Sequence, residues 1–140
     1  MVAKTLKQDL DASVLKLAEF LELNRRERIF EYPFGHSFPV NCCESVSLIL
    51  IFLIEEKYGA SNVRLIKGTT PKKHEHHLWV TVGDWVYDLT AHQFRNQKKI
   101  IGALFSPLHF RYKDWMIENG RDFVEREQII ELYRSGVIPF

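Results

Sequence analysis

The first pattern along the chain is helical. Over 5–23, apolar residues return every three or four positions with polar and charged residues between them, which predicts an amphipathic helix. Thr5 and Gln8 fit a capping box at the start of this helix. The following segment, 24–41, contains two Pro, one Gly and several aromatic residues. We expect it to form a long, structured loop.

A second helix is expected over 42–58. Asn41 suits the N-cap position, Glu44 follows it three residues later, and Gly59 suits the C-terminal end. The run VSLILIFLI makes the middle of this helix apolar on nearly every side, so we expect most of its surface to be buried. The same run has nine residues and is too short to cross a bilayer.

Strand patterns follow the second helix. A short strand is expected over 63–67, and two more over 77–82 and 85–89 are joined by Gly83-Asp84, a loop that suits a tight hairpin. The stretch KKIIGALFSP reads as a further strand or a buried turn, and 113–119 and 125–135 read as short helices. The 140 residues therefore predict one α+β domain over 1–140.

The hairpin fixes which side chains meet. If Gly83-Asp84 is the loop, side-chain alternation places His77, Trp79 and Asp88 on one face and His76 on the other. His77 and Asp88 are then diagonal neighbours, roughly 7 Å apart at the backbone. A histidine held by a carboxylate is the base and orienting acid of a catalytic triad. The alternative is a surface hairpin with a histidine-rich edge.

Charge and composition limit the classes of partner that the protein is expected to bind. Lys plus Arg number 19 and Asp plus Glu number 18, so no electrostatic footprint for nucleic acid arises. The charged N-terminal segment has no apolar signal-peptide core. We therefore expect a cytoplasmic protein with no membrane partner, or one delivered as a leaderless effector.

The two cysteines are adjacent, at Cys42 and Cys43, an arrangement that strains a disulfide. At a helix N-terminus, free N–H groups and the macrodipole favour a thiolate, which is the nucleophilic form. Both thiols would occupy the first helical turn. The alternative is that both are small core residues.

NCCESVSLIL followed by HHLWVTVGDWVYDLTAHQF resembles the core of the papain-like and transglutaminase-like cysteine enzymes. These place Cys at the start of a buried helix, His-x-Trp-Val on one strand and Asp-x-Thr on the next. The resemblance covers about 41–94 and is closest to small bacterial papain-fold toxin or effector domains, some of which are glutamine deamidases.

The resemblance implies a Cys-His-Asp triad of Cys43, His77 and Asp88. Ser47, a small residue one turn after Cys43, favours that thiol over Cys42, which stays the alternative nucleophile. One departure concerns the oxyanion hole, because the family's Gln six residues before the nucleophile corresponds to Ser37.

Residues other than a Gln at that position would then complete the site. Asn41 and Gln93 are the candidates for the missing donor, and Trp79 for substrate binding beside His77.

The expected function is a cysteine hydrolase or acyl transferase that acts on a glutamine side chain or a peptide bond of a protein or peptide. It would work through a thioester, without a cofactor or a metal. A catalytically inactive binding or regulatory module is the main alternative. Zinc bound by His74, His76 and His92 is a further one, but no carboxylate completes a recognisable ligand spacing.

Overall fold

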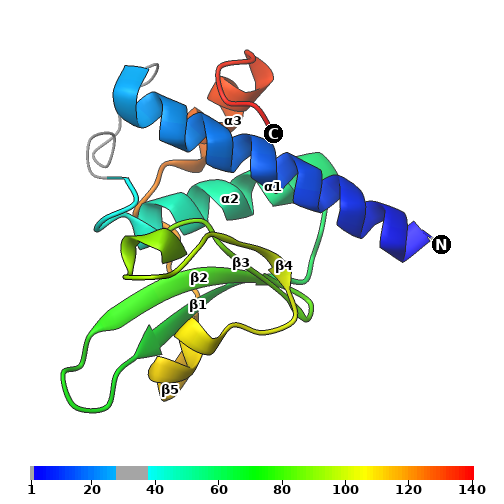
Figure 1. Ribbon diagram of the computed structural model, residues 1–140. Helices are drawn as coiled ribbons and strands as arrows, with labels where there is room; N and C mark the ends of the chain where they lie inside the picture. Colours follow the sequence, from blue (N-terminus) through cyan, green and yellow to red (C-terminus); the bar gives the residue numbers. More distant parts are fainter. Residues whose placement is uncertain (1, 28–37) are drawn as a thin grey trace.

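A computed structural model describes residues 2–27 and 38–140 (Figure 1). The helices are α1 (Val2–Glu27), α2 (Cys43–Tyr58) and α3 (Arg126–Arg134), with short 3-10 helices η1 (Ala91–Gln93) and η2 (Pro107–Arg111). The strands are β1 (Val63–Thr69), β2 (His76–Val82), β3 (Trp85–Asp88), β4 (Ile100–Ala103) and β5 (Asp114–Glu118). The expected α+β class is confirmed. None of the helices within 2–27 and 38–140 is both long and apolar enough to span a membrane.

Helix α1 is longer than its sequence pattern predicts. It begins at Val2, so Thr5 lies inside the helix and the capping-box prediction is wrong. The buried residues Leu10, Val14 and Leu17 form the stripe that faces the core and follow the predicted helical spacing. The helix crosses α2 (Figure 1) and also lies against the sheet, where the Tyr87 hydroxyl of β3 donates to Asp11 Oδ1 at 2.6 Å.

Helix α2 is the central element, as the sequence predicts. All ten residues from Ser45 to Ile54 are buried. The helix ends where Gly59 adopts a left-handed conformation, with φ 61°, and its N–H donates to the Glu55 carbonyl at 3.0 Å. Glycine takes this conformation without a steric cost, which explains why the helix stops there.

The sheet has five antiparallel strands in the order β4-β3-β2-β1-β5. The predicted hairpin register is confirmed, since Val82 pairs with Trp85 and Thr81 with Val86. Alternate residues of β2 therefore face opposite ways. Leu78 and Val80 join the core beneath α2, whereas Trp79 joins a smaller cluster on the other face.

The C-terminal part departs from prediction in one place. The segment expected as a helix over 113–119 is strand β5, which pairs with β1 at the edge of the sheet. The chain reaches this edge from β4, at the opposite edge, through η2, which lies on the face of the sheet away from α2 (Figure 1). The helix expected over 125–135 is present as α3.

Candidate active site

The two thiols stand at the N-terminus of α2, but one position later than predicted. Cys42 is the N-cap and Cys43 the first helical residue, with no side-chain cap bond. Asn41 precedes the helix with φ 57°, a left-handed conformation that Asn tolerates better than most residues. The prediction of Asn41 as the N-cap is therefore wrong, although the first turn still presents its free N–H groups and positive dipole end to Cys43.

The adjacent cysteines have different environments. Cys42 is 2% exposed and packs in the main core. Burial, together with the neighbouring Cys43, raises the pKa of the Cys42 thiol to about 12, so it stays protonated at neutral pH. Cys43 is only partly buried. One turn later, Ser47 Oγ donates to the Leu78 carbonyl of β2 at 3.4 Å. Because residues four apart share a helix face, Cys43 lies on the side of α2 that faces β2.

His77 and Asp88 form the contact that strand alternation predicts. His77 Nε2 lies 2.6 Å from Asp88 Oδ2, and each side chain is 1% exposed. The pairing of β2 with β3 brings these two residues together, while the adjacent His76 is exposed and contacts Thr69 Oγ1 at 2.9 Å through Nδ1.

Asp88 accepts hydrogen bonds on both of its carboxylate oxygens. Oδ1 receives the Thr90 N–H at 3.1 Å and the Thr90 hydroxyl at 3.3 Å. Oδ2 receives His77 and also His109, whose Nε2 lies 2.8 Å away. Burial raises the pKa of Asp88, but hydrogen bonds from His109 and His77 and the charges of both rings outweigh it and lower the pKa to about 2. The carboxylate is therefore ionised at neutral pH and fully hydrogen-bonded.

Asp88 and Cys43 both act on the ring of His77. Burial lowers its pKa, while hydrogen bonds with Asp88 and Cys43 and the charges of both raise it more, to about 9. Because Nε2 faces Asp88, Nδ1 is the ring nitrogen that remains for an interaction with the thiol. His77 thus joins a carboxylate on β3 to a thiol at the start of α2, which is the arrangement of a base with its orienting acid and its nucleophile.

Sequence reasoning missed His109. This residue lies on η2 and is 1% exposed. Its ring stacks on that of Trp79, with centroids 3.8 Å apart and planes at 7°. The only sequence signal is a histidine between apolar neighbours in SPLHFRY, and nothing in that pattern points to Asp88, 21 residues earlier.

The three auxiliary candidates have different positions. Trp79 is 1% exposed, so it packs beneath the site and does not offer a surface to a substrate. Asn41 is exposed, and its backbone turns away from the helical conformation at the entry to α2. Gln93 is half-buried on η1, where its N–H donates to the Thr90 carbonyl at 3.0 Å. Ser37, at the position of the family's oxyanion-hole Gln, lies outside the described residues.

The histidines proposed as an alternative zinc site do not come together. Within 2–27 and 38–140, the one grouping of potential metal ligands is His77, Asp88 and His109. His74 is exposed, and both ring nitrogens of the half-buried His92 have no hydrogen-bond partner among the described residues. The Nε2–Oδ2 separations of 2.6 and 2.8 Å in the buried group are hydrogen-bond lengths. A metal ion would have to replace both of these bonds.

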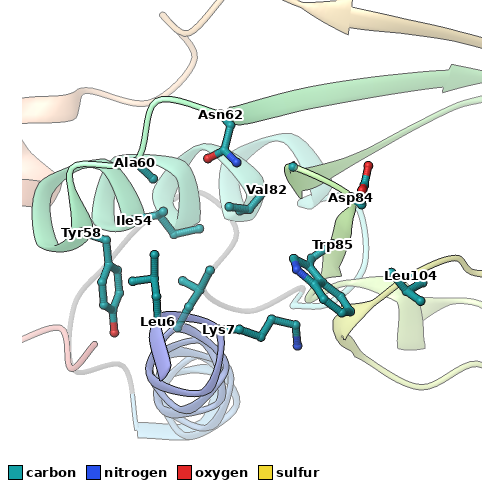
Figure 2. Close-up of a pocket in the computed structure, with 12 residues that line it drawn as sticks. Leu6, Lys7, Ile54, Tyr58, Ala60, Asn62, Val82, Asp84, Trp85 and Leu104 are labelled. Carbon is teal, nitrogen blue, oxygen red and sulfur yellow. The ribbon is translucent and has the colours of Figure 1, made fainter. Parts of the chain in front are cut away.

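An apolar pocket of about 270 Å³ lies elsewhere, between α1, the end of α2 and the β2–β3 turn. In Figure 2, Leu6, Ile54 and Val82 point into it, with Tyr58 and Trp85 on either side. None of its lining residues belongs to the Cys43–His77–Asp88 group. The pocket is therefore separate from the thiols.

Comparisons with known proteins found no match to a family model, a curated protein or a solved structure.

Proposed function

We propose that this protein is a papain-like cysteine hydrolase or acyl transferase that acts on an amide of a protein or peptide. The amide is a glutamine side chain or a peptide bond. Cys43 is the nucleophile, His77 the general base and acid, and Asp88 the group that orients His77. One observation carries the proposal: His77 is hydrogen-bonded to Asp88 at 2.6 Å, and the Cys43 thiol is near enough to the same ring to raise its pKa.

The first half of the reaction forms a thioester. His77 takes the Cys43 proton, and the thiolate attacks the amide carbonyl, forming a carbon–sulfur bond. The tetrahedral intermediate collapses as the carbon–nitrogen bond breaks, and His77 gives its proton to the departing ammonia or amine. The ionised Asp88 stabilises the positive ring of His77 throughout this step.

The second half releases the acyl group. His77 removes a proton from water, the oxygen attacks the thioester, and the carbon–sulfur bond breaks. The Cys43 sulfur then recovers its proton from His77. If an amine replaces water, the same steps transfer the acyl group instead. The products distinguish deamidation, peptide cleavage and transfer.

Backbone groups offer the first stabilisation of the oxyanion. Cys43 is the first residue of α2, where backbone N–H groups have no carbonyl partner within the helix. The Cys43 N–H and the positive end of the helix dipole would thus face the negative oxygen that forms beside the sulfur.

Asp88 in turn depends on His109 and Thr90. Both donate to its carboxylate, and the stacking of His109 on Trp79 limits the movement of the donor ring. We assign His109 a positioning role, since it acts on His77 only through Asp88. Fixed orientation of this kind lowers the barrier because the reacting groups need not be ordered during the reaction.

The proposal is tested first by thiol reactivity. Iodoacetamide alkylation is measured against pH for the wild type and for Cys43→Ala, Cys42→Ala and His77→Gln. We expect alkylation of one thiol below about pH 8. This reaction should disappear in Cys43→Ala, persist in Cys42→Ala and move to higher pH in His77→Gln. If only Cys42→Ala abolishes it, the nucleophile is Cys42.

The same proteins are then tested on glutamine-containing peptides, with ammonia release and peptide mass as readouts. Removal of the base in His77→Gln should slow turnover by about 10²–10⁴-fold. Turnover that survives in Cys43→Ala would exclude covalent catalysis by this thiol.

A non-catalytic binding module is the second candidate, and the exposed apolar residues of β5 favour it. In that case Cys43 would react with iodoacetamide only at the pH of an ordinary thiol, and His77→Gln would not change its profile.

A further inference from the structure

We propose that the free edge of β5 binds an extended segment of a partner protein, which adds a sixth strand to the sheet. The segment has a basic residue, three apolar residues and a second basic residue. The β5 surface consists of Asp114–Glu118 together with Phe105 and Phe110. This inference goes beyond the proposed chemistry and does not depend on it.

The edge of β5 is open to pairing. One side of β5 pairs with β1, and the other has no strand beside it within the described parts of the chain. An open strand edge presents unpaired N–H and C=O groups, which proteins usually protect with Pro, lysine side chains or a bulge. Instead Trp115, Met116 and Ile117 are 51%, 55% and 44% exposed, and no register shift is found between β1 and β5.

A row of aromatic rings extends this apolar surface. Phe105 and Phe110 stack with centroids 6.2 Å apart, and Phe110 and Trp115 with centroids 6.4 Å apart and planes at 3°. All three side chains are more than half exposed. A continuous apolar patch of this kind is typical of an interaction site.

The surface rests on a fixed base. The Trp115 indole N–H donates to the His109 carbonyl at 3.2 Å, and its ring lies edge-on to the buried Trp79 ring, with centroids 5.3 Å apart. Little side-chain freedom of Trp115 is therefore left to lose on binding, which favours affinity.

The charges of β5 define the partner. Side-chain alternation places Asp114, Met116 and Glu118 on one face of β5, with the acidic residues on either side of the apolar one. A strand paired to β5 presents its own side chains directly opposite these three. Basic residues opposite Asp114 and Glu118, and apolar residues between them, would satisfy this pattern in either strand direction.

The same charges disfavour a second copy of this chain as the occupant. A two-fold antiparallel pairing that uses all of β5 would place Asp114 of each copy opposite Glu118 of the other. Like charges directly opposite one another destabilise a strand pair.

The test uses a capped synthetic peptide that contains Lys-Tyr-Val-Ile-Lys, with the intact protein. Binding is followed by the chemical shifts and hydrogen exchange of the β5 amides. We expect shifts and added protection confined to β5 and the aromatic row. The peptide Glu-Tyr-Val-Ile-Glu should bind about tenfold more weakly, as should the lysine peptide with alternate amides N-methylated.

The protein charges are then reversed. Asp114→Lys with Glu118→Lys should prefer the glutamate peptide, whereas Glu127→Lys with Glu131→Lys, which make the same charge change on α3, should keep the wild-type preference. Cys43→Ala should bind like the wild type. Equal binding of the two peptides, or shifts away from β5, would overturn the proposal. A wild-type dimer that Asp114→Lys with Glu118→Lys alters would assign the edge to self-association instead.

Discussion

His109 and Asp88 are joined by a hydrogen bond of 2.8 Å between Nε2 and Oδ2, although they lie 21 residues apart. The bond connects η2, on one face of the sheet, to the end of β3. It makes Asp88 the shared acceptor of two buried histidines, of which only His77 also contacts a thiol. The orientation of the proposed base thus depends on a residue that does not touch the nucleophile.

Substitution of His109 tests this dependence. In His109→Ala the carboxylate loses one donor, so the pKa of Asp88 should rise from about 2. The alkylation rate of Cys43 falls when the pH is lowered, and this fall should then occur at a higher pH than in the wild type. At neutral pH the alkylation rate should be about tenfold lower.

His109→Gln, whose amide can still donate, should recover part of both effects. The matched control is His74→Ala, at an exposed histidine outside the group. A rate loss of the same size at every pH, with no movement of the acid side, would mean that His109 has a structural role only.

The buried carboxylate should also matter to folding. Both histidines contact Oδ2 of Asp88, whereas the Thr90 N–H and hydroxyl donate to Oδ1. In Asp88→Asn an amide N–H therefore faces either the two histidine rings or the two Thr90 donors, in place of an acceptor. Removing one partner of a buried charged group costs about 3–5 kcal/mol. Urea unfolding at neutral pH should show a loss in this range, while Asp84→Asn, an exposed aspartate in the hairpin turn, should change the free energy of unfolding little. Equal stability of the two variants would contradict the network.

The hairpin explains why half of the candidate site could be predicted from sequence. A two-residue loop fixes the register of its strands, and alternation then selects His77 over His76 as the partner of Asp88. His109 could not be found this way. Its place depends on the path of the chain between opposite edges of the sheet, and no local pattern encodes that path.

Helix α2 and strand β5 show the same difference. The long apolar run of α2, between a capping pattern and Gly59, predicts a buried helix, and that prediction is confirmed. The segment at β5 is short and mixed in character, and only the exposed edge of β1 makes it a strand. Residue type favours Asn41 as the N-cap of α2, but the backbone places Cys42 there. The residue at which a helix begins depends on the local backbone dihedral angles, which residue type alone does not determine.

Gly68 provides a test of the packing beneath the site. A Cβ added there would lie 2.7 Å from both Trp79 and Tyr112, closer than van der Waals contact allows. Gly68→Ala should therefore destabilise the fold by about 1–3 kcal/mol and displace the ring on which His109 stacks. The alkylation rate of Cys43 should fall with it. Gly120→Ala, where a Cβ would meet only the Glu118 side chain, at 3.8 and 3.9 Å, is the control.

Metal removal separates the thiol mechanism from a metal-dependent one. The only grouping of potential ligands in the described chain is His77, Asp88 and His109, and the proposed mechanism needs all three as a hydrogen-bonded set. Chelators should leave the alkylation profile and turnover unchanged, and added zinc should inhibit by displacing protons from His77 and His109. Loss of activity on chelation, restored by zinc, would favour a metal enzyme.

The pH dependence of stability should change sign when Asp88 is replaced. The two proteins compared are the one that keeps Asp88 and the Asp88→Asn variant. Both carry Cys43→Ser, so that this thiol contributes no proton. With Asp88 present, hydrogen bonding raises the pKa of His77 above its ordinary value of 6.5. The folded state then binds more protons than the unfolded state. This contribution is complete below about pH 6.5 and is lost as pH rises through the folded pKa, with a slope of up to about 1.4 kcal/mol per pH unit.

In Asp88→Asn the carboxylate that raises the pKa of His77 is absent. Burial is then the main influence on this pKa, and burial lowers it. The unfolded state now binds more protons, so stability should fall as pH drops through about 6.5. Urea unfolding between about pH 5 and 9 measures both curves, and His77→Gln should remove the opposing slopes from each. Parallel curves for the two proteins would mean that Asp88 does not control the protonation of His77, and the base of the proposed mechanism would lose its orienting acid.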